Sequence, residues 1–200
     1  EINMNPKRDI HMNRKIMSLM LASMLASVSN HGITGTEGES YIGAQYGIGD
    51  YDEDGVSKTF NPTALIGVFG YYFHPNFSVE GRVGIGLQDD TQFVPEFGLS
   101  GVEATLDIEY LAGLYGTGHI NLTESSSIYG VLGASNVKAT ASVPSIPALK
   151  ATDDETGVSF GVGADIGISK NIALNIEYMR YLNKSDYDLD VIGLGAKYSF

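Results

Sequence analysis

The chain has 200 residues, with 12 basic and 24 acidic side chains and a formal net charge of −12. It contains no cysteine, which excludes a disulfide scaffold, a thiolate metal site and a lipidated N-terminal cysteine. An acidic chain without a basic patch is not expected to bind nucleic acid. The 25 glycines, 12 tyrosines and 8 phenylalanines suit a barrel wall made of short strands.

The beginning of the chain differs in character from the rest. A basic start, Met12–Lys15, precedes an apolar stretch at residues 16–28. This is the pattern of a secretory signal peptide, and the apolar run is too short for a transmembrane helix. We therefore expect an upstream segment at 1–11, a signal peptide at 12–29, a flexible mature N-terminus at 30–39 and a barrel domain at 40–200.

From residue 40 onward, apolar residues alternate with small or polar ones, and no window shows a convincing helical period. Between residues 77 and 87, for example, Val79, Val83 and Ile85 share one face, while Glu80 and Arg82 share the other. Such alternation predicts strands with one apolar and one polar face. Eight strands are expected, at Ser40–Tyr51, Thr59–Phe73, Phe77–Leu87, Val102–Gly116, Ser127–Val137, Val158–Ile168, Ile172–Tyr178 and Asp188–Phe200.

The expected connections alternate in length. The long acidic ones follow the first, third and fifth strands, at Asp50–Lys58, Gln88–Gly101 and Lys138–Gly157, whereas His74–Asn76 and Lys170–Asn171 are tight turns. Short turns on one rim and longer loops on the other are typical of outer-membrane barrels, which place both termini on the short-turn side. A soluble eight-stranded barrel such as a lipocalin is the alternative, because periodicity alone does not say which face is outside.

The last strand ends on an apolar face that carries aromatic residues. Its Gly195-x-x-Tyr198-x-Phe200 resembles the C-terminal signal read by the barrel assembly machinery. Residues 40–200 as a whole resemble the small outer-membrane β-barrel proteins that include the OmpA transmembrane domain. Within this range, Val79–Gly86 and Ser127–Gly133 are similar to wall strands of that family. The resemblance implies an all-β, eight-stranded antiparallel transmembrane β-barrel of up-and-down topology in a Gram-negative outer membrane. It implies no single activity, because the family includes structural proteins, adhesins and small pores.

If the apolar faces meet lipid, a set of charged side chains points into the barrel. These are Glu80, Arg82, Glu103, Asp107, Glu109, Asp165, Glu177 and Lys197. An eight-stranded barrel is just wide enough for side chains to fill it, so the charges must pair or be hydrated. Two interpretations stay open: a polar core held by ion pairs through Arg82 and Lys197, and a narrow, gated, cation-preferring path.

The first long loop carries an acidic repeat. Asp50, Asp52 and Asp54 precede Gly55, as at the opening of an EF-hand-type calcium loop. The twelfth position is Asn61 where such loops have glutamate, and no flanking helices are expected. A weak external Ca²⁺ site and a solvated acidic loop are the two interpretations, and no other cofactor is expected.

Catalysis is not expected. His31 lies by the signal cleavage site, His74 and His119 lie at or near short turns where exposure explains them, and none pairs with an obvious nucleophile at the outer rim. Arg180, near the outer end of the seventh strand, is placed either to reach lipopolysaccharide phosphates or simply to be solvated. Aromatic residues are expected to form interfacial girdles: Tyr71, Phe73, Phe77, Tyr178, Tyr198 and Phe200.

These observations predict a non-enzymatic outer-membrane protein with a structural and surface-recognition role, of adhesin or receptor type, through its acidic loops. A small gated pore for ions or minor solutes is the alternative. The expected partners are outer-membrane lipid and lipopolysaccharide, the barrel assembly machinery, and a host-surface or phage ligand that the sequence does not name.

Overall fold

The computed structural model describes residues 35–53, 60–93, 103–146, 148–185 and 187–200. The expected upstream segment and signal peptide lie outside these residues. Within the described part of the chain, no helix is long and apolar enough to cross a membrane.

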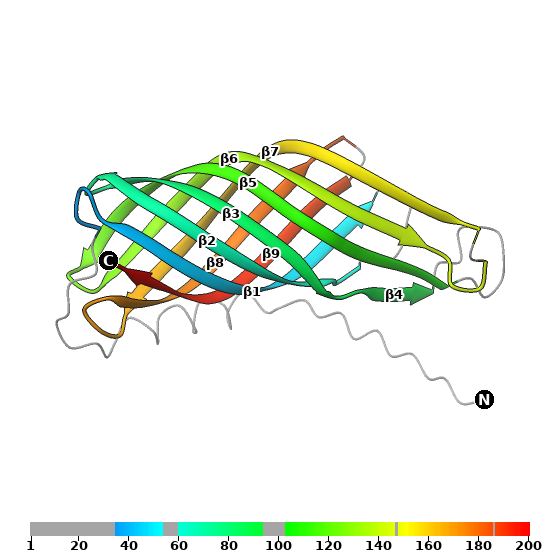
Figure 1. Cartoon of the computed structure of the whole chain (residues 1–200), viewed down its shortest axis with the longest axis horizontal. Helices are drawn as coiled ribbons and strands as arrows, with labels where there is room; N and C mark the ends of the chain where they lie inside the picture. The colour runs from blue at the N-terminus through cyan, green and yellow to red at the C-terminus, as the bar shows by residue number, and fades with distance from the viewer. Residues whose placement is uncertain (1–34, 54–59, 94–102, 147, 186) are drawn as a thin grey trace, which may run out of the picture.

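The described elements are all strands. They are β1 (Ser40–Glu53), β2 (Thr63–His74), β3 (Phe77–Gln88), β4 (Asp90–Phe93), β5 (Glu103–Thr123), β6 (Ser126–Ser142), β7 (Lys150–Gly167), β8 (Ile172–Asn183) and β9 (Tyr187–Ser199). They pair antiparallel in the order β3-β2-β1-β9-β8-β7-β6-β5-β4, and a β3–β5 pairing closes the sheet. Eight strands form the barrel, and the short β4 adds to β5 beyond it (Figure 1). The predicted eight-stranded antiparallel barrel is therefore confirmed.

The two ends of the barrel differ. One end, the short-turn rim, holds the turns after β2, β5 and β7 and the C-terminus (Figure 1). The opposite end, the long-strand rim, is reached by β4 and by the extended ends of β5, β6 and β7. At the short-turn rim, the rings of Phe73 and Phe77 stack with centroids 6.3 Å apart, as do those of Tyr198 and Phe200. These aromatic side chains lie exposed on the outer surface, where an interfacial girdle requires them.

The strands at the long-strand rim are longer than the sequence indicated. The expected loop Lys138–Gly157 is mostly strand, because β6 continues to Ser142 and β7 begins at Lys150. Polar side chains support this extension across the strands: the hydroxyls of Thr140 and Thr152 are 2.8 Å apart. A strand in water needs no apolar outer face, so its polar pattern is easily taken for that of a loop.

A register shift in β5 reverses which of its side chains point into the barrel. The β5–β6 ladder is irregular between Ile108 and Tyr110, which is the geometry of a β-bulge. One extra residue exchanges inside and outside, so Leu106 and Ile108 are buried in the barrel. The three acids in this part of β5 are exposed instead: Glu103, Asp107 and Glu109. Their predicted inward orientation is therefore wrong.

The core of the barrel has two levels. Around the middle and toward the short-turn rim the buried side chains are largely polar or tyrosine, as expected for a wall whose outer face is apolar. Toward the long-strand rim they form an aliphatic cluster, here called the apolar seal. It comprises Ile66, Ile108, Leu111, Val137, Met179, Leu182, Leu189 and Val191.

Candidate functional site

The remaining five predicted interior charges lie inside the barrel, where they form what we call the lumen network: Glu80, Arg82, Asp165, Glu177 and Lys197. Arg82 extends from β3 across the lumen and donates to Glu80 through Nε at 2.8 Å. On the opposite wall it donates to both carboxylate oxygens of Glu177, at 2.5 and 2.9 Å. Because Arg82 is 2 % exposed, this bidentate contact is sheltered from water.

The second base of the lumen network lies closer to the short-turn rim. Lys197 Nζ lies 3.1 Å from Asp165 and 4.3 Å from the ring centre of Tyr129. Asn175 donates to the same aspartate at 2.8 Å, and the Tyr129 hydroxyl donates to Glu177 at 2.9 Å. These contacts join both halves of the lumen network into one connected structure.

The lumen network is well satisfied. Tyr41 on β1 donates to Glu80 at 2.5 Å, and Gln45 donates to Asn175 at 2.5 Å. Among buried side-chain polar atoms of the described residues, those without a hydrogen-bond partner are Thr63 Oγ1 and Asp188 Oδ1. Neither atom belongs to the lumen network. Hydrogen-bond partners therefore offset most of the free-energy cost of burying the charges of this network.

His119 lies where the sequence did not place it. We expected an exposed side chain near a turn, but β5 continues to Thr123 and carries His119 into the lumen, where it is 5 % exposed. Its ring packs between Tyr72 and Tyr129, and Nε2 lies 3.3 Å from Ser78 Oγ. His74, by contrast, is exposed at the short-turn rim, and His31 lies outside the described residues.

The apolar seal covers the lumen network on the side of the long-strand rim. Ile66, Met179 and Val191 are among its most buried members, each at most 5 % exposed. A small barrel filled by side chains has no room for a water column through such a cluster. The sequence did not place Ile108 and Leu182 in this cluster, because the bulges in β5 and β8 that turn them inward leave no local sequence signal.

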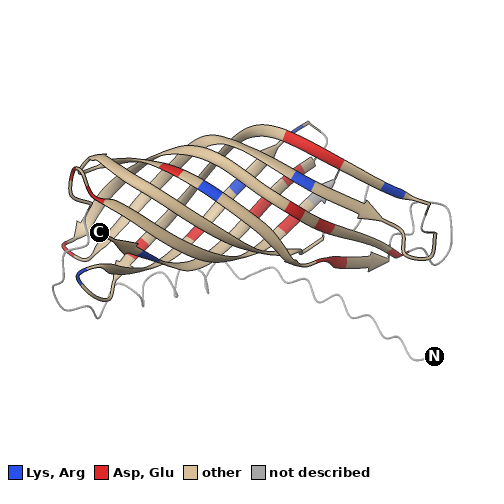
Figure 2. Ribbon diagram, in the orientation of Figure 1, with Lys and Arg blue, Asp and Glu red and all other residues tan. Residues whose placement is uncertain are grey.

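The acidic surface lies on what we call the rim sheet: β4, residues 103–109 of β5, 138–142 of β6 and 150–155 of β7. It carries seven carboxylates and two lysines (Figure 2). Lys138 forms an ion pair with Glu109 at 2.7 Å. The hydrogen bonds from Lys138 and from Thr140 hold the pKa of Glu109 below its usual range. With seven carboxylates against two lysines, the rim sheet carries an excess of acidic side chains.

Arg180 does not extend toward lipid headgroups as expected. It shares the outer surface of β8 with Tyr178, but its guanidinium pairs with Asp190 at 2.7 Å and with Asp188 at 2.9 Å. Both carboxylates come from the neighbouring β9, whose pairing with β8 brings them alongside. The positive charge of Arg180 is thus neutralised within the wall.

The predicted calcium ligands lie partly in a strand. Asp50 and Asp52 belong to β1, where they are directly across from Asp190 and Asp188 of β9. Asp54 lies outside the described residues. Within those residues, no group of three or more carboxylate, histidine or cysteine side chains is arranged to hold a metal ion. Calcium binding by this segment stays a prediction.

The predicted assembly signal lies at the seam where the barrel closes. Tyr198 pairs with Ile42 and Gly195 with Gln45 of β1. Phe200 continues the ladder through two backbone hydrogen bonds with Ser40, at 2.8 and 3.1 Å. The signal residues therefore form part of the pairing that joins the first barrel strand to the last, although their reading by an assembly machinery stays a prediction.

Comparison with known proteins agrees with this geometry. The model of the outer membrane protein beta-barrel domain family matches residues 18–200. Among solved structures, the attachment invasion locus protein Ail of Yersinia pestis is similar, with 23% identity, a TM-score of 0.59, and coverage of 82% of this chain and all of Ail. OprG of Pseudomonas aeruginosa is 17% identical, with a TM-score of 0.58 over 87% of this chain and 99% of OprG. Neisserial surface protein A is 13% identical, with a TM-score of 0.58 over 82% of this chain and all of that protein. No curated protein matches the chain.

Proposed function

Since the chain belongs to the outer membrane protein β-barrel family and is an integral outer-membrane barrel, we propose that it is a non-enzymatic surface-recognition protein that presents the rim sheet outside the cell. The orientation follows from the short turns and the C-terminus, which such barrels keep on the periplasmic side. The observation that carries the proposal is the rim sheet itself, an antiparallel extension of the wall with seven carboxylates and two lysines.

The charge of the rim sheet indicates the kind of ligand. Ail of Yersinia pestis has been crystallised with the heparin analogue sucrose octasulfate, which is a polyanion. A polyanion would be repelled by the rim sheet of this chain, whereas a basic protein segment on a host surface would be attracted. We therefore infer that the ligand is a basic protein surface.

Neutralising part of the rim sheet tests this function. The triple variant Glu103→Gln, Asp107→Asn, Asp153→Asn removes three exposed charges. We expect the triple variant in nanodiscs to associate with cultured epithelial cells about tenfold more slowly than the wild type, because long-range electrostatic attraction sets the association rate. Glu124→Gln, an exposed acid at the short-turn rim, serves as the matched control and should leave binding unchanged. Equal binding by the triple variant and the wild type would count against recognition by the rim sheet.

The pore alternative draws support from the excess of acids in the lumen network, where Glu80, Glu177 and Asp165 face Arg82 and Lys197. The apolar seal and the paired charges argue against conduction. We expect the refolded protein to be silent in a planar bilayer, with folding checked by its mobility shift on heating. Discrete cation-selective openings that disappear in an Arg82 variant would make the pore the primary function.

Catalysis has little support. Ser78 and His119 are in contact, but Ser78 is 0 % exposed and its hydroxyl also contacts Tyr41 and Thr117. A nucleophile must be accessible to its substrate, and Ser78 is buried inside the barrel beside the lumen network.

A further inference from the structure

One edge of the rim sheet has no neighbouring strand among the described residues. β7 pairs with β6 along its length, but its pairing with β8 covers only Phe160–Gly167. The reason lies in β8, whose ladder with β9 is irregular between Arg180 and Leu182, and such a bulge bends a strand away from its neighbour. Residues 150–156 of β7, which we call the open edge, therefore lack a ladder partner on the side away from β6. They extend over about 23 Å at ~3.3 Å per residue.

The direction of the backbone groups of β7 follows from its other end. The Gly167 N–H donates to the carbonyl of Ser125, on the side of β6, and the Ile168 N–H donates to the carbonyl of Ile172, on the side of β8. The β6–β7 ladder is regular over its whole length, so this alternation continues along the strand. The even-numbered residues of β7 therefore direct their N–H and C=O groups away from β6.

A side-chain contact confirms this direction at the open edge. The Thr156 carbonyl accepts a hydrogen bond from Lys184 Nζ at 2.9 Å, on the side where β8 would otherwise pair. By the same parity, Lys150, Thr152 and Asp154 each direct one N–H donor and one C=O acceptor to the open edge. These are the groups that an added strand would pair with.

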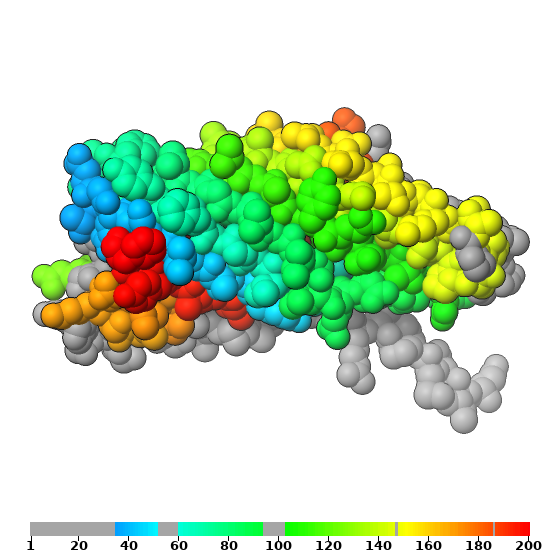
Figure 3. Space-filling model, viewed as in Figure 1, coloured from blue at the N-terminus to red at the C-terminus, as the bar shows by residue number. Residues whose placement is uncertain are grey.

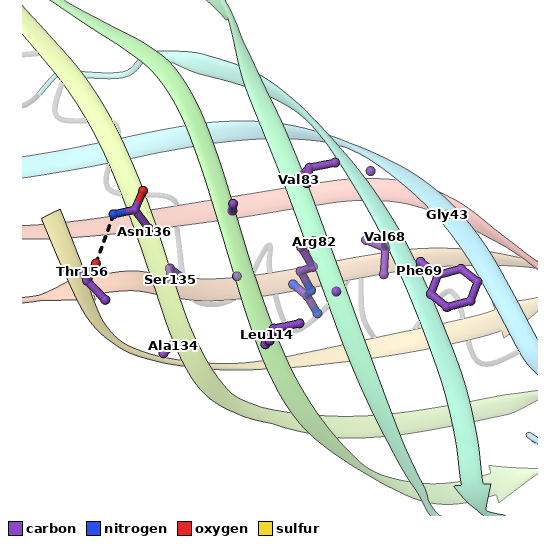
Figure 4. A pocket seen from close by; sticks show the side chains of 14 residues that line it. Gly43, Val68, Phe69, Arg82, Val83, Leu114, Ala134, Ser135, Asn136 and Thr156 are labelled. Atoms are coloured by element: carbon purple, nitrogen blue, oxygen red, sulfur yellow. Dashed lines mark hydrogen bonds between the residues drawn. The ribbon is translucent and has the colours of Figure 1, made fainter. Parts of the chain in front are cut away.

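The open edge stands in water. Residues 150–154 are exposed, and Figure 3 shows this part of the chain (yellow) at the surface toward the long-strand rim. On β7 the outward residues change from Val158 to Thr156, whose hydroxyl accepts from the Asn136 amide of β6 at 3.0 Å (Figure 4). Unpaired backbone groups are not tolerated in hydrocarbon, so the wall has left the lipid at this level. A partner outside the cell can therefore reach the open edge.

The charge of the open edge selects its occupant. Asp153, Asp154 and Glu155 are consecutive, so acids lie on both faces of the strand. A second copy of this chain pairing through the same edge would bring these acids together, and like charges across a ladder are destabilising. Lysine or arginine side chains on an added strand would instead be attracted to them. The edge therefore disfavours its own copy and favours a basic segment.

We propose that the open edge binds an extended basic segment of the partner protein, which adds to the rim sheet as a strand beside β7. This inference rests on the proposed recognition by the rim sheet and specifies the form in which the partner is bound. Backbone hydrogen bonds to Thr152 and Asp154 hold the added strand, and the acids select lysine and arginine on it. A folded basic surface without a free strand would not be held in this way.

Two peptides of equal charge test the proposal. The first is a decapeptide of alternating lysine and threonine, and the second is the same peptide N-methylated at two adjacent central residues, which blocks both of its edges. Their affinities for nanodisc-embedded full-length protein are measured by fluorescence anisotropy. We expect the methylated peptide to bind about tenfold more weakly, which corresponds to ~1.4 kcal/mol and to the loss of one or two hydrogen bonds.

A substitution on β7 provides the reciprocal test. Thr152→Pro removes an N–H at the open edge but no hydrogen bond to β6, because that N–H points away from β6. Thr152→Ala is the matched control, since it also loses the hydroxyl that contacts Thr140 at 2.8 Å but keeps the N–H. We expect the unmodified peptide to bind Thr152→Pro about tenfold more weakly than Thr152→Ala, with folding of both variants verified by heat-modifiable mobility.

The outcomes separate this inference from the function on which it rests. Equal binding of the two peptides, or equal affinity of the two Thr152 variants, overturns strand addition. A dimer of the wild type that only Thr152→Pro abolishes overturns it in favour of a second copy. Unchanged cell association of the rim-sheet triple variant removes the recognition function itself, whereas slowed association together with equal peptide binding removes strand addition alone.

Discussion

Replacing Arg82 with alanine is expected to destabilise the folded barrel by about 3–5 kcal/mol. The substitution leaves Glu80 and Glu177 buried at 2 % exposure each without the guanidinium that holds both. It also removes the cation over the ring of Tyr115, 4.9 Å from the ring centre. Denaturant unfolding of the protein in lipid vesicles measures the change in the free energy of unfolding.

Two controls separate buried charge from general damage. The triple variant Glu80→Gln, Arg82→Met, Glu177→Gln removes all three charges at once and should recover most of the loss, because buried ion pairs replaced as a set cost little. Arg180→Ala breaks ion pairs of a partly exposed guanidinium and should cost at most ~1 kcal/mol. An Arg82→Ala free energy equal to that of the wild type would show that the lumen is hydrated and that the charges are screened there.

Gly195→Ala is expected to prevent or severely weaken closure of the barrel. A Cβ at this position would overlap the carbonyl oxygen of Ala44 and come within 2.9 Å of Gln45 Cα, both backbone atoms of β1. Backbone atoms of a paired strand move only if the β1–β9 ladder opens, so we expect a loss of about 3 kcal/mol. The fraction of protein with heat-modifiable gel mobility after refolding reports closure directly.

The neighbouring glycine of the same face provides the control. At Gly193 the nearest atom to an added Cβ is Gln45 Oε1 at 3.3 Å, the far end of a flexible side chain that can shift. Gly193→Ala should therefore fold nearly as well as the wild type. If both variants refold equally, the seam tolerates a Cβ and the requirement for Gly195 lies in recognition during assembly.

The sequence predicted correctly whether a side chain points into the lumen or to the outer surface wherever this depends only on local alternation. The strand at residues 77–88 placed Glu80 and Arg82 inside and Val79 and Val83 outside, because in an unbroken strand successive side chains point to opposite faces. The same rule placed Glu177 and Lys197 in the lumen. The polar partners Tyr41 and Asn175 share that parity on their own strands and could have been found by the same signal.

The sequence failed where the direction of a side chain, or its contact with another side chain, depends on how two strands pair. The bulge at Ile108–Tyr110 is a property of the β5–β6 register, and it moved three acids from the lumen to the outer surface. Likewise, the neutralisation of Arg180 requires β9 to bring Asp188 and Asp190 alongside. These residues are separated in the chain by a turn, and alternation within either strand does not reveal their contact.

By itself, then, the sequence determined the strands, the apolar wall, the acidic character and the charges on the unbroken polar faces, because all of these follow from composition and a period of two. The tertiary structure alone decided where that period shifts and which side chains meet across strands. It thereby produced the inward positions of Ile108 and Leu182 in the apolar seal, the buried position of His119 and the rim sheet in place of an expected loop. Each of these depends on the register between strands, which nearest-neighbour sequence patterns do not specify.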